Sequence, residues 1–478
     1  MKRFSKSSKL LSVLLAATLV LAGCNNDSGD TKKTTEGSDE EVEQSSEKEE
    51  EPSENKEESE GEETGEQRVL KVDSFSGGNG PEAFKALKES FEDKYPDIKV
   101  ELRFERELDA VLNKENATGQ YSDVVYYNLG QASAYTETQL NNGEVLPIND
   151  VYDAISDRMD DSFKDTPIGN YFGDGTQYLL PIKYTPAGLF YNTELIGEGK
   201  TYELPETWDD MWKLGEECVK DGRYLFTYPH NGYFDTVLQG LLDEAGGSDF
   251  LGKAMSYADG TWESDEGKLV LDTLGKLVSA DNEFLHPDTV ANANAKDGFK
   301  LNQQLVIDDK ALFMPNGDWI VGEMAETTPE EGFHWGVMPL PAFEEGGERV
   351  STAFTEQAWI PKQAPNPDDA KLFLEYIYSE EGTKIMVDNG FVVPVKGVND
   401  LITDEYKQEF FSIYQLDNVR ASIGAFAPYD TASVPNVDFA AQVYDPIDQI
   451  ATGNMTVDQW QKQLTELWTT LREHPIAE

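Results

Sequence analysis

Hydrophobic and polar residues recur with distinct periods along the chain, and these periods predict its elements. Residues 69–75 have the composition of a strand. The segment between Pro81 and Pro96 then carries phenylalanine and leucine at the spacing of one helical face, with the first proline suited to the opening turn. Alternating apolar residues predict strands over 98–104 and 124–127. This succession predicts parallel strands joined by crossover helices, which is an α/β arrangement.

The remaining pattern is mostly helical, with short apolar strands between the helices. Thr207 and Asp210 have capping-box spacing and predict a helix start. Cys218 lies on the apolar face of that helix, so it is predicted to be a small buried residue rather than a reactive thiol. The other predicted elements are helices over 265–280, 368–381 and 456–472, and strands over 177–182, 188–191, 311–314, 335–338 and 358–360.

The first 68 residues follow a different pattern. Residues 1–23 place a basic stretch before a 14-residue apolar run, which is shorter than the roughly 20 residues that span a bilayer and predicts a secretory signal peptide. The run ends in Leu-Ala-Gly before Cys24, which resembles the bacterial lipobox; Cys24 is therefore predicted to carry the lipid anchor, the alternative being an ordinary cleavage site. Residues 25–68 hold 18 acidic and 5 basic residues, so 24–68 is predicted to be a lipidated, disordered tether.

Composition narrows the possible ligands. The net charge of −52 repels nucleic acid and anionic lipid, and it supports the hypothesis that the protein faces a saline or alkaline exterior. Two cysteines and four dispersed histidines predict no metal site. A GxGxxA pattern over 78–83 is followed by Glu105 near the end of the second strand. We interpret it as a flexible turn rather than a dinucleotide site, so no cofactor is predicted.

Longer segments spread over most of residues 69–478 resemble the extracellular solute-binding lipoproteins of ABC importers, in the carbohydrate-binding family that includes maltose-binding protein. They are FKALKESFEDKYPDIKVEL, GQYSDVVYY, YLLPIKYTPAGLFYNTEL, LPETWDDMWKLGEE, ALFMPNGDWIVGEM, WGVMPLPAF and AWIPKQAPNPDDAKLFLEYIYSEEG. The resemblance implies a two-lobed, type II periplasmic-binding-protein fold with a three-segment hinge at 183–187, 338–342 and 391–395. It divides the chain into an N-terminal lobe (69–183 plus 343–391) and a C-terminal lobe (188–338 plus 396–478).

Sugar recognition combines aromatic rings on pyranose C–H faces with polar groups on hydroxyls. The resemblance implies that Trp319 is a stacking platform, that Asn316 and Asp318 are hydroxyl partners, and that Tyr233 is a second aromatic contact. It also implies ligand contacts from Tyr127 and Gln131 in the first lobe, while Glu356 and Tyr429 are candidates through their place near the expected site. Core packing is the alternative for each aromatic, and it is the prediction for Trp208, Trp212, Trp460 and Trp468.

The sequence also departs from the maltose-binding pattern. The first-lobe loop over 76–79 lacks the charged pair found there, and Gln131 replaces an arginine, so the sugar is left unidentified. The overall prediction is a surface-anchored, monomeric receptor without enzymatic activity that delivers a sugar or oligosaccharide to ABC permease subunits. The alternatives are a secreted carbohydrate-active enzyme, which needs two carboxylates at a fixed separation, and a receptor for a non-sugar solute.

Overall fold

The structure is a computed structural model of the 478-residue chain, and it describes residues 67–76, 80–131, 133–164, 166–296 and 298–476. All of these lie in one compact unit, residues 63–478. The predicted signal peptide, Cys24, nearly all of the predicted tether and most of the 76–79 loop lie outside the described residues. Strand β1 begins at Arg68, one residue inside the range predicted for the tether, and Arg68 pairs with Asp369 at 2.8 Å.

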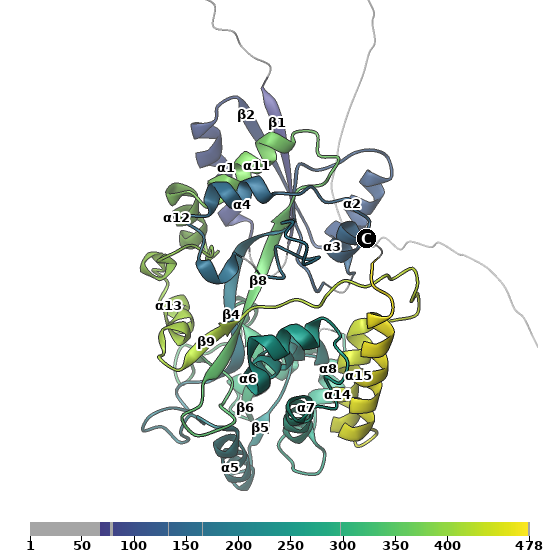
Figure 1. The fold of residues 1–478 in the computed structure, drawn as a ribbon. Coiled ribbons are helices and arrows are strands. Elements are labelled where there is room, and N and C mark those ends of the chain that lie inside the picture. The colour runs from purple at the N-terminus through teal and green to yellow at the C-terminus, as the bar shows by residue number, and fades with distance from the viewer. Residues whose placement is uncertain (1–66, 77–79, 132, 165, 297, 477–478) are drawn as a thin grey trace, which may run out of the picture. The chain divides into compact units, whose positions relative to one another are not determined.

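The strands of the described residues form a mixed sheet in the order β2-β1-β3-β8-β4-β6-β5, with β7 beside β4 and β9 beside β8 (Figure 1). Strand β1 pairs in parallel with β2 and β3, as predicted, whereas β8 and β4 run antiparallel to their neighbours in the centre of this order. The strands are β1 (Arg68–Phe75), β2 (Ile98–Glu105), β3 (Val124–Tyr126), β4 (Leu180–Asn192), β5 (Tyr224–Phe226), β6 (Ala311–Gly317), β7 (Trp335–Met338), β8 (Arg349–Trp359) and β9 (Val419–Ser422).

Helices account for most of the other described residues. The helix start predicted at Thr207 is present: its hydroxyl accepts a hydrogen bond from the Asp210 amide at 3.1 Å. At the start of α15, Thr456 and Gln459 form a complete capping box. The helices are α1 (Glu82–Lys94), α2 (Leu108–Asn116), α3 (Tyr135–Asn141), α4 (Asn149–Ile155), η1 (Asp161–Phe163), α5 (Trp208–Lys220), η2 (Asn231–Tyr233), α6 (Phe234–Met255), α7 (Asp265–Val278), α8 (Thr289–Ala293), α9 (Phe299–Ile307), α10 (Ile320–Glu323), α11 (Pro367–Ile377), α12 (Glu380–Asp388), η3 (Val398–Leu401), α13 (Glu405–Phe411), η4 (Ser412–Gln415), α14 (Phe439–Ala451) and α15 (Val457–Arg472).

The sheet carries two large and separate hydrophobic cores, which define a two-lobed molecule. One core draws on residues 70–182 and 353–411, and Figure 1 shows α1, α4, α11 and α12 gathered around it. The other draws on residues 189–340 and 434–471, under α5, α6, α7, α14 and α15. Cys218 is fully buried in the second core, where burial raises the pKa of its thiol to about 12, which confirms its prediction as a buried apolar residue. The prediction of core tryptophans is confirmed for three residues, Trp208, Trp460 and Trp468, while Trp212 is half-buried at the edge.

Two predicted elements differ in the structure. The strands predicted over 177–182 and 188–191 are one continuous strand, β4, because residues 180–187 pair with β8. This ladder tolerates Pro181 beside a bulge and Pro186 within it. The helix predicted over 368–381 is two helices, because Ser379 accepts a hydrogen bond from the Gly382 amide and starts α12 afresh. Across the described ranges, no helix is both long and apolar enough to cross a bilayer.

Candidate functional site

Trp319 lies at the turn between β6 and α10. Its half-buried ring meets two other rings edge-on: Tyr233 at 6.4 Å and Phe354 of β8 at 5.4 Å between centroids. The third close neighbour is Gly317, where a Cβ atom would overlap the indole. The glycine therefore allows the ring to lie against the end of β6.

Tyr233 closes η2 and directly precedes α6, and its half-buried ring also lies 4.7 Å from the ring of His230. Burial raises the pKa of its hydroxyl, with added repulsion from the carboxylates of Glu323 and Asp235, so the hydroxyl is a neutral donor and acceptor at neutral pH. The structure thus brings two of the predicted aromatics, Trp319 and Tyr233, into one pair.

Asp235 is a residue beside this pair that the sequence analysis missed. Its side chain keeps contact with solvent, yet enough of the protein surrounds it that desolvation raises the pKa of the carboxyl to about 6. The Thr236 amide donates to its Oδ1 at 2.6 Å, and its charge also raises the pKa of the buried Tyr444 hydroxyl. Among the described residues it forms no ion pair. A solvent-accessible carboxylate without a cationic partner suits hydrogen bonds from ligand hydroxyls.

Asp318 and Glu356, both predicted ligand contacts, belong to a set of charged side chains that we call the ion cluster: Lys183, Asp318, Glu356 and Lys407. The ammonium group of Lys183, fully buried, lies 2.8 Å from Glu356 Oε1 and 3.7 Å from Asp318 Oδ1. Lys407 Nζ reaches Asp318 Oδ2 at 3.1 Å. Burial would raise the pKa of Asp318, but the charges of Lys183 and Lys407 outweigh it and hold that pKa below its ordinary value. Burial lowers the pKa of Lys183 to about 8, against the pull of Asp318.

Asn316 is buried on β6, one strand position from Gly317. Its Oδ1 accepts a hydrogen bond from the Gly317 amide at 2.9 Å, while its Nδ2 is buried without a hydrogen-bond partner among the described residues. An unpaired buried donor costs free energy, which makes this amide a group that gains from an added acceptor.

Tyr127 and Gln131 lie beyond the end of β3. Tyr127 is almost wholly buried between Phe75 and Tyr135, and its hydroxyl lies 3.0 Å from Ser133 Oγ. Gln131 is half-buried, and its carbonyl accepts a hydrogen bond from the Ala134 amide. Tyr127 is therefore chiefly a packing residue here, with Gln131 the more accessible of the two.

Strand β8 contacts both the residues that follow β3, Asn128 and Leu129, and the ring of Trp319. Gln357 Oε1 accepts a hydrogen bond from the Leu129 amide at 3.0 Å, and the Gln357 amide donates to Asn128 Oδ1 at 3.1 Å. Phe354, three residues earlier on β8, contacts Trp319. Three strand residues span about 10 Å, which is the separation of Phe354 and Gln357 along β8.

Tyr429 packs elsewhere. Its ring meets Tyr257 at 6.3 Å and Phe439 at 6.5 Å, at the edge of the second core. Burial raises the pKa of its hydroxyl, and Asp438 and Glu137 of α3 add to this effect. Glu137 Oε2 is itself buried without a partner among the described residues. The described ring contacts join Tyr429 to these residues rather than to the Trp319–Tyr233 pair.

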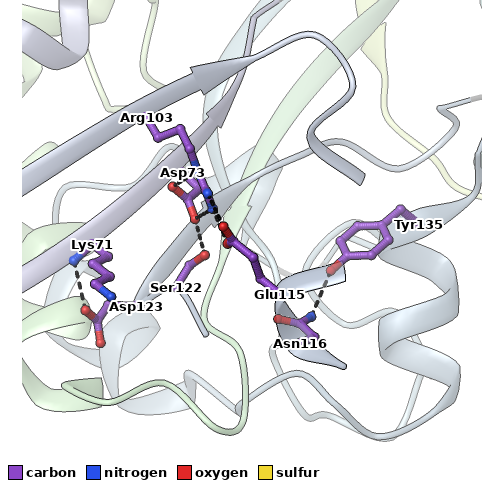
Figure 2. Close-up of polar contacts among 8 residues, drawn as sticks. All are labelled: Lys71, Asp73, Arg103, Glu115, Asn116, Ser122, Asp123 and Tyr135. Atoms are coloured by element: carbon purple, nitrogen blue, oxygen red, sulfur yellow. Dashed lines mark hydrogen bonds and ion pairs between the residues drawn. The ribbon is translucent and has the colours of Figure 1, made fainter. Parts of the chain in front are cut away.

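The carboxyl ends of β1 and β2 carry a second polar network (Figure 2). Arg103 holds Asp73 through two hydrogen bonds of 2.8 and 2.6 Å and Glu115 of α2 through another of 2.6 Å. Ser122 also donates to Asp73, and Arg103 in turn lowers the pKa of Glu115. The arginine is thus neutralised by two carboxylates and is not free to bind an anion. Nearby, Asn116 donates to the Tyr135 hydroxyl at 3.2 Å.

The described side chains do not form a metal centre: no group of three or more His, Cys, Asp or Glu residues in these ranges is placed to hold an ion. Asp235 escaped the sequence analysis because 91 acidic residues offer no contrast by which to select one. The available signal was its place two residues after Tyr233, in the first turn of a helix.

Two cores on one mixed sheet, with aromatic and polar groups brought together along β8, define a solute-binding fold. The chain belongs to the family of bacterial extracellular solute-binding proteins, whose family model matches residues 86–410. The solute receptor AcbH, reported with an exclusive preference for β-D-galactopyranose, has the same fold, with a TM-score of 0.64, 18% identity, and coverage of 85% of this chain and 100% of that one. Lmo0181 from Listeria monocytogenes, solved with cycloalternan, aligns with a TM-score of 0.62 at 16% identity, covering 84% of this chain and 98% of that one.

Curated relatives are similar over shorter stretches. An arabinooligosaccharide-binding protein of Halalkalibacterium halodurans is 26% identical over 278 residues, which are 57% of this chain and 58% of that protein. The diacetylchitobiose binding protein NgcE of Streptomyces coelicolor is 26% identical over 202 residues, 41% of this chain and 42% of that protein. The chain thus spans about half the length of these relatives.

Proposed function

We propose that the protein is the substrate-binding receptor of an ABC importer, which captures a sugar or oligosaccharide between its two lobes and delivers it to a membrane permease. The observation that carries this proposal is the Trp319–Tyr233 pair with the unpaired carboxylate of Asp235 beside it. A ring pair of this kind offers an apolar face to a pyranose, and the carboxylate accepts hydrogen bonds from its hydroxyls. The sugar-binding names of the relatives support the same ligand class.

We assign a different role to each of the other predicted contacts. Asn316 supplies the free amide donor, and Gln131 approaches from the first lobe, where Tyr127 lines the base. Glu356 and Asp318 act from the ion cluster, and Tyr429 contacts the far end of a longer oligosaccharide. Because Asp235 carries no neutralising cation and Arg103 is already paired, the proposed site favours uncharged sugars over uronic acids.

We propose a receptor rather than a carbohydrate-active enzyme. Glycoside hydrolysis needs a carboxylic acid and a second carboxylate facing the scissile bond. Asp318 and Glu356 are both buried and paired with lysine, which suits ionised structural groups better than a proton donor. Incubation with bound oligosaccharide should release no reducing ends; their appearance would favour the enzyme.

A lipid anchor at Cys24 on the outer face of the cytoplasmic membrane, a flexible tether and a monomeric state complete the proposal. The lipobox-like sequence before Cys24 supports the anchor. Cys24→Ser should shift the protein from the membrane fraction to the medium. Retention of the variant on membranes after a carbonate wash would contradict the anchor.

The test of the ligand site is Trp319→Ala, measured by calorimetry with arabinotriose, diacetylchitobiose, raffinose and maltotriose. We expect at least one sugar to bind the unmodified protein and its binding to weaken by about 2–4 kcal/mol in the variant, as for a buried aromatic anchor. Trp212→Ala is the matched control, because Trp212 is also half-buried but stacks on Phe284 of the second core. That control should lower the melting temperature without changing affinity. Equal affinity of Trp319→Ala and the unmodified protein would refute the site.

A further inference from the structure

The ion cluster contains two lysines and two carboxylates in a largely water-free setting. The side chains of Lys183, Asp318 and Glu356 are 0, 4 and 7% exposed, whereas Lys407 retains 22%. Removing two or more charges from water is expensive, so such a cluster persists only where its geometry is tightly satisfied. In other proteins, apolar residues have often replaced buried ion pairs without loss of stability, so a buried cluster of this kind suggests a role besides stability.

The members of the cluster come from segments that are far apart in the sequence. Lys183 lies on β4, directly opposite Glu356 on β8, within the first predicted hinge segment. Lys407 lies on α13 and also donates to the Gly390 carbonyl at 2.8 Å, next to the third predicted hinge segment. The Lys183 ammonium lies 5.6 Å from the ring centre of Phe391 in that same segment. The cluster therefore connects two of the three predicted hinge segments.

Asp318 attaches this cluster to the proposed stacking platform. It directly precedes Trp319 in the chain, and its two carboxylate oxygens face different lysines. The Asp318 backbone carbonyl accepts a hydrogen bond from the Val321 amide and so belongs to the turn that opens α10. Because Asp318 and Trp319 are joined by one peptide bond, a shift of Asp318 towards or away from Lys407 also moves Trp319.

Helix α13 is not packed solidly on all sides. Gln408 and Phe411, on the same helix as Lys407, line a hollow of about 310 Å³ that is open to solvent, together with Asn399, Ile402 and Gln415. Space next to a short helix permits small rigid shifts of that helix. Lys407 is thus carried by a short helix that borders this hollow.

We propose that Lys407 and Lys183 are positioning residues for ligand binding: through Asp318 they hold Trp319 in its stacking orientation and couple that orientation to the hinge segments. This inference rests on the proposed function, because it assigns Trp319 to the sugar. Neither lysine touches the sugar in this scheme. Asp318 is accordingly a positioning residue rather than a hydroxyl partner.

The experiment is a double-mutant cycle on sugar affinity, using the full chain and the panel of arabinotriose, diacetylchitobiose, raffinose and maltotriose. Lys407→Met should weaken binding of the sugar that binds best by about tenfold, and Lys407→Arg should restore most of it. In a Trp319→Ala background the same Lys407→Met change should weaken binding by less than twofold, because the orientation that it controls is already lost. Trp319→Phe replaces Trp319→Ala if binding by the latter is too weak to measure.

Lys384→Met is the matched control, since Lys384 also pairs with a carboxylate, Asp388 at 2.7 Å, but lies on the surface of α12. It should leave affinity unchanged. The proposal is overturned if Lys407→Met lowers the melting temperature and not the affinity, or if it weakens binding equally with and without Trp319. Absence of binding by every sugar to the unmodified protein refutes the proposed function and this inference together. If a sugar binds and the effects of Lys407→Met and Trp319→Ala on its binding free energy add fully, the inference is refuted and the proposed function is not.

Discussion

The pKa values of two aspartates beside the Trp319–Tyr233 pair are shifted in opposite directions. The pKa of Asp318 is held low because two lysines face it, despite its burial. The pKa of Asp235 is raised to about 6 because desolvation acts on it without a cationic partner. When two side chains of the same type have different pKa values because of their surroundings, they are suited to different roles. Here Asp318 suits a permanent structural charge, and Asp235 suits contact with a ligand.

Asp235→Asn should raise the melting temperature at pH 7.5 while weakening sugar binding at least tenfold. The folded-state pKa of Asp235 lies above its ordinary value, so the unfolded state loses its proton first and stability falls as pH rises from about 4 to about 6. Because the side chain retains solvent contact, the gain is small, about 1 °C. Scanning calorimetry at pH 7.5 and 4 checks it. A gain of the same size at both pH values would contradict the assigned ionisation.

Lys183 makes a separate prediction at alkaline pH. Its folded-state pKa of about 8 lies below its ordinary value of 10.5, so the folded state loses the proton first and stability attributable to this group rises between about pH 8 and 10.5. Relative to Lys183→Met, the unmodified protein should gain stability over this range, measured by urea unfolding at pH 7.5 and 10. Parallel stability curves for the two proteins would show that Lys183 is not desolvated as described.

At the scale of elements, the turn between β6 and α10 depends on one glycine. Gly317→Ala places a methyl group where the Trp319 ring lies, so we expect the ring to be displaced and sugar binding to weaken by about tenfold or more, with modest loss of stability. Isothermal titration with the panel sugars measures it. Gly322→Ala is the control, because a Cβ at Gly322 meets no atom within 4 Å and alanine favours a helix. If Gly317→Ala and Gly322→Ala bind the sugar with equal affinity, the position of the Trp319 ring does not determine binding.

Elements with local chemical signals were predictable from the sequence. Helices α5 and α15 begin at threonine caps, and β1 and β2 show their periods directly. Strand β4 was not predictable as one element, because two prolines read as interruptions and only the partner strands on both sides keep it extended. The Trp319 turn could be placed by resemblance. The ion cluster could not, because its members are buried and their ion-pair partners lie more than 80 positions away in the chain. Asp235 could not, because one carboxylate does not stand out among 91 acidic residues.

At the scale of the whole molecule, two lobes with separate cores are free to change their relative orientation when a ligand bridges them. Small-angle scattering should therefore show a smaller radius of gyration with a saturating panel sugar than without it. The same measurement on Trp319→Ala at that sugar concentration should show little change. An unchanged profile for the unmodified protein, with binding confirmed by calorimetry, would mean that the lobes keep one arrangement.

The continuity of β4 determines how such a movement would take place. The strand is continuous from Leu180 to Asn192, with one bulge beside Pro181, and is bonded to β8 along its first half and to β6 and β7 along its second. A flexible loop would let the lobes rotate with little resistance. A strand that stays hydrogen-bonded to its neighbours distributes the rotation over several residues and opposes it elastically. We expect closure on a sugar to be elastic, with recoil of the sheet driving reopening. The amide protons of Lys183, Tyr184, Thr185 and Ala187 should accordingly exchange slowly with deuterium in both states.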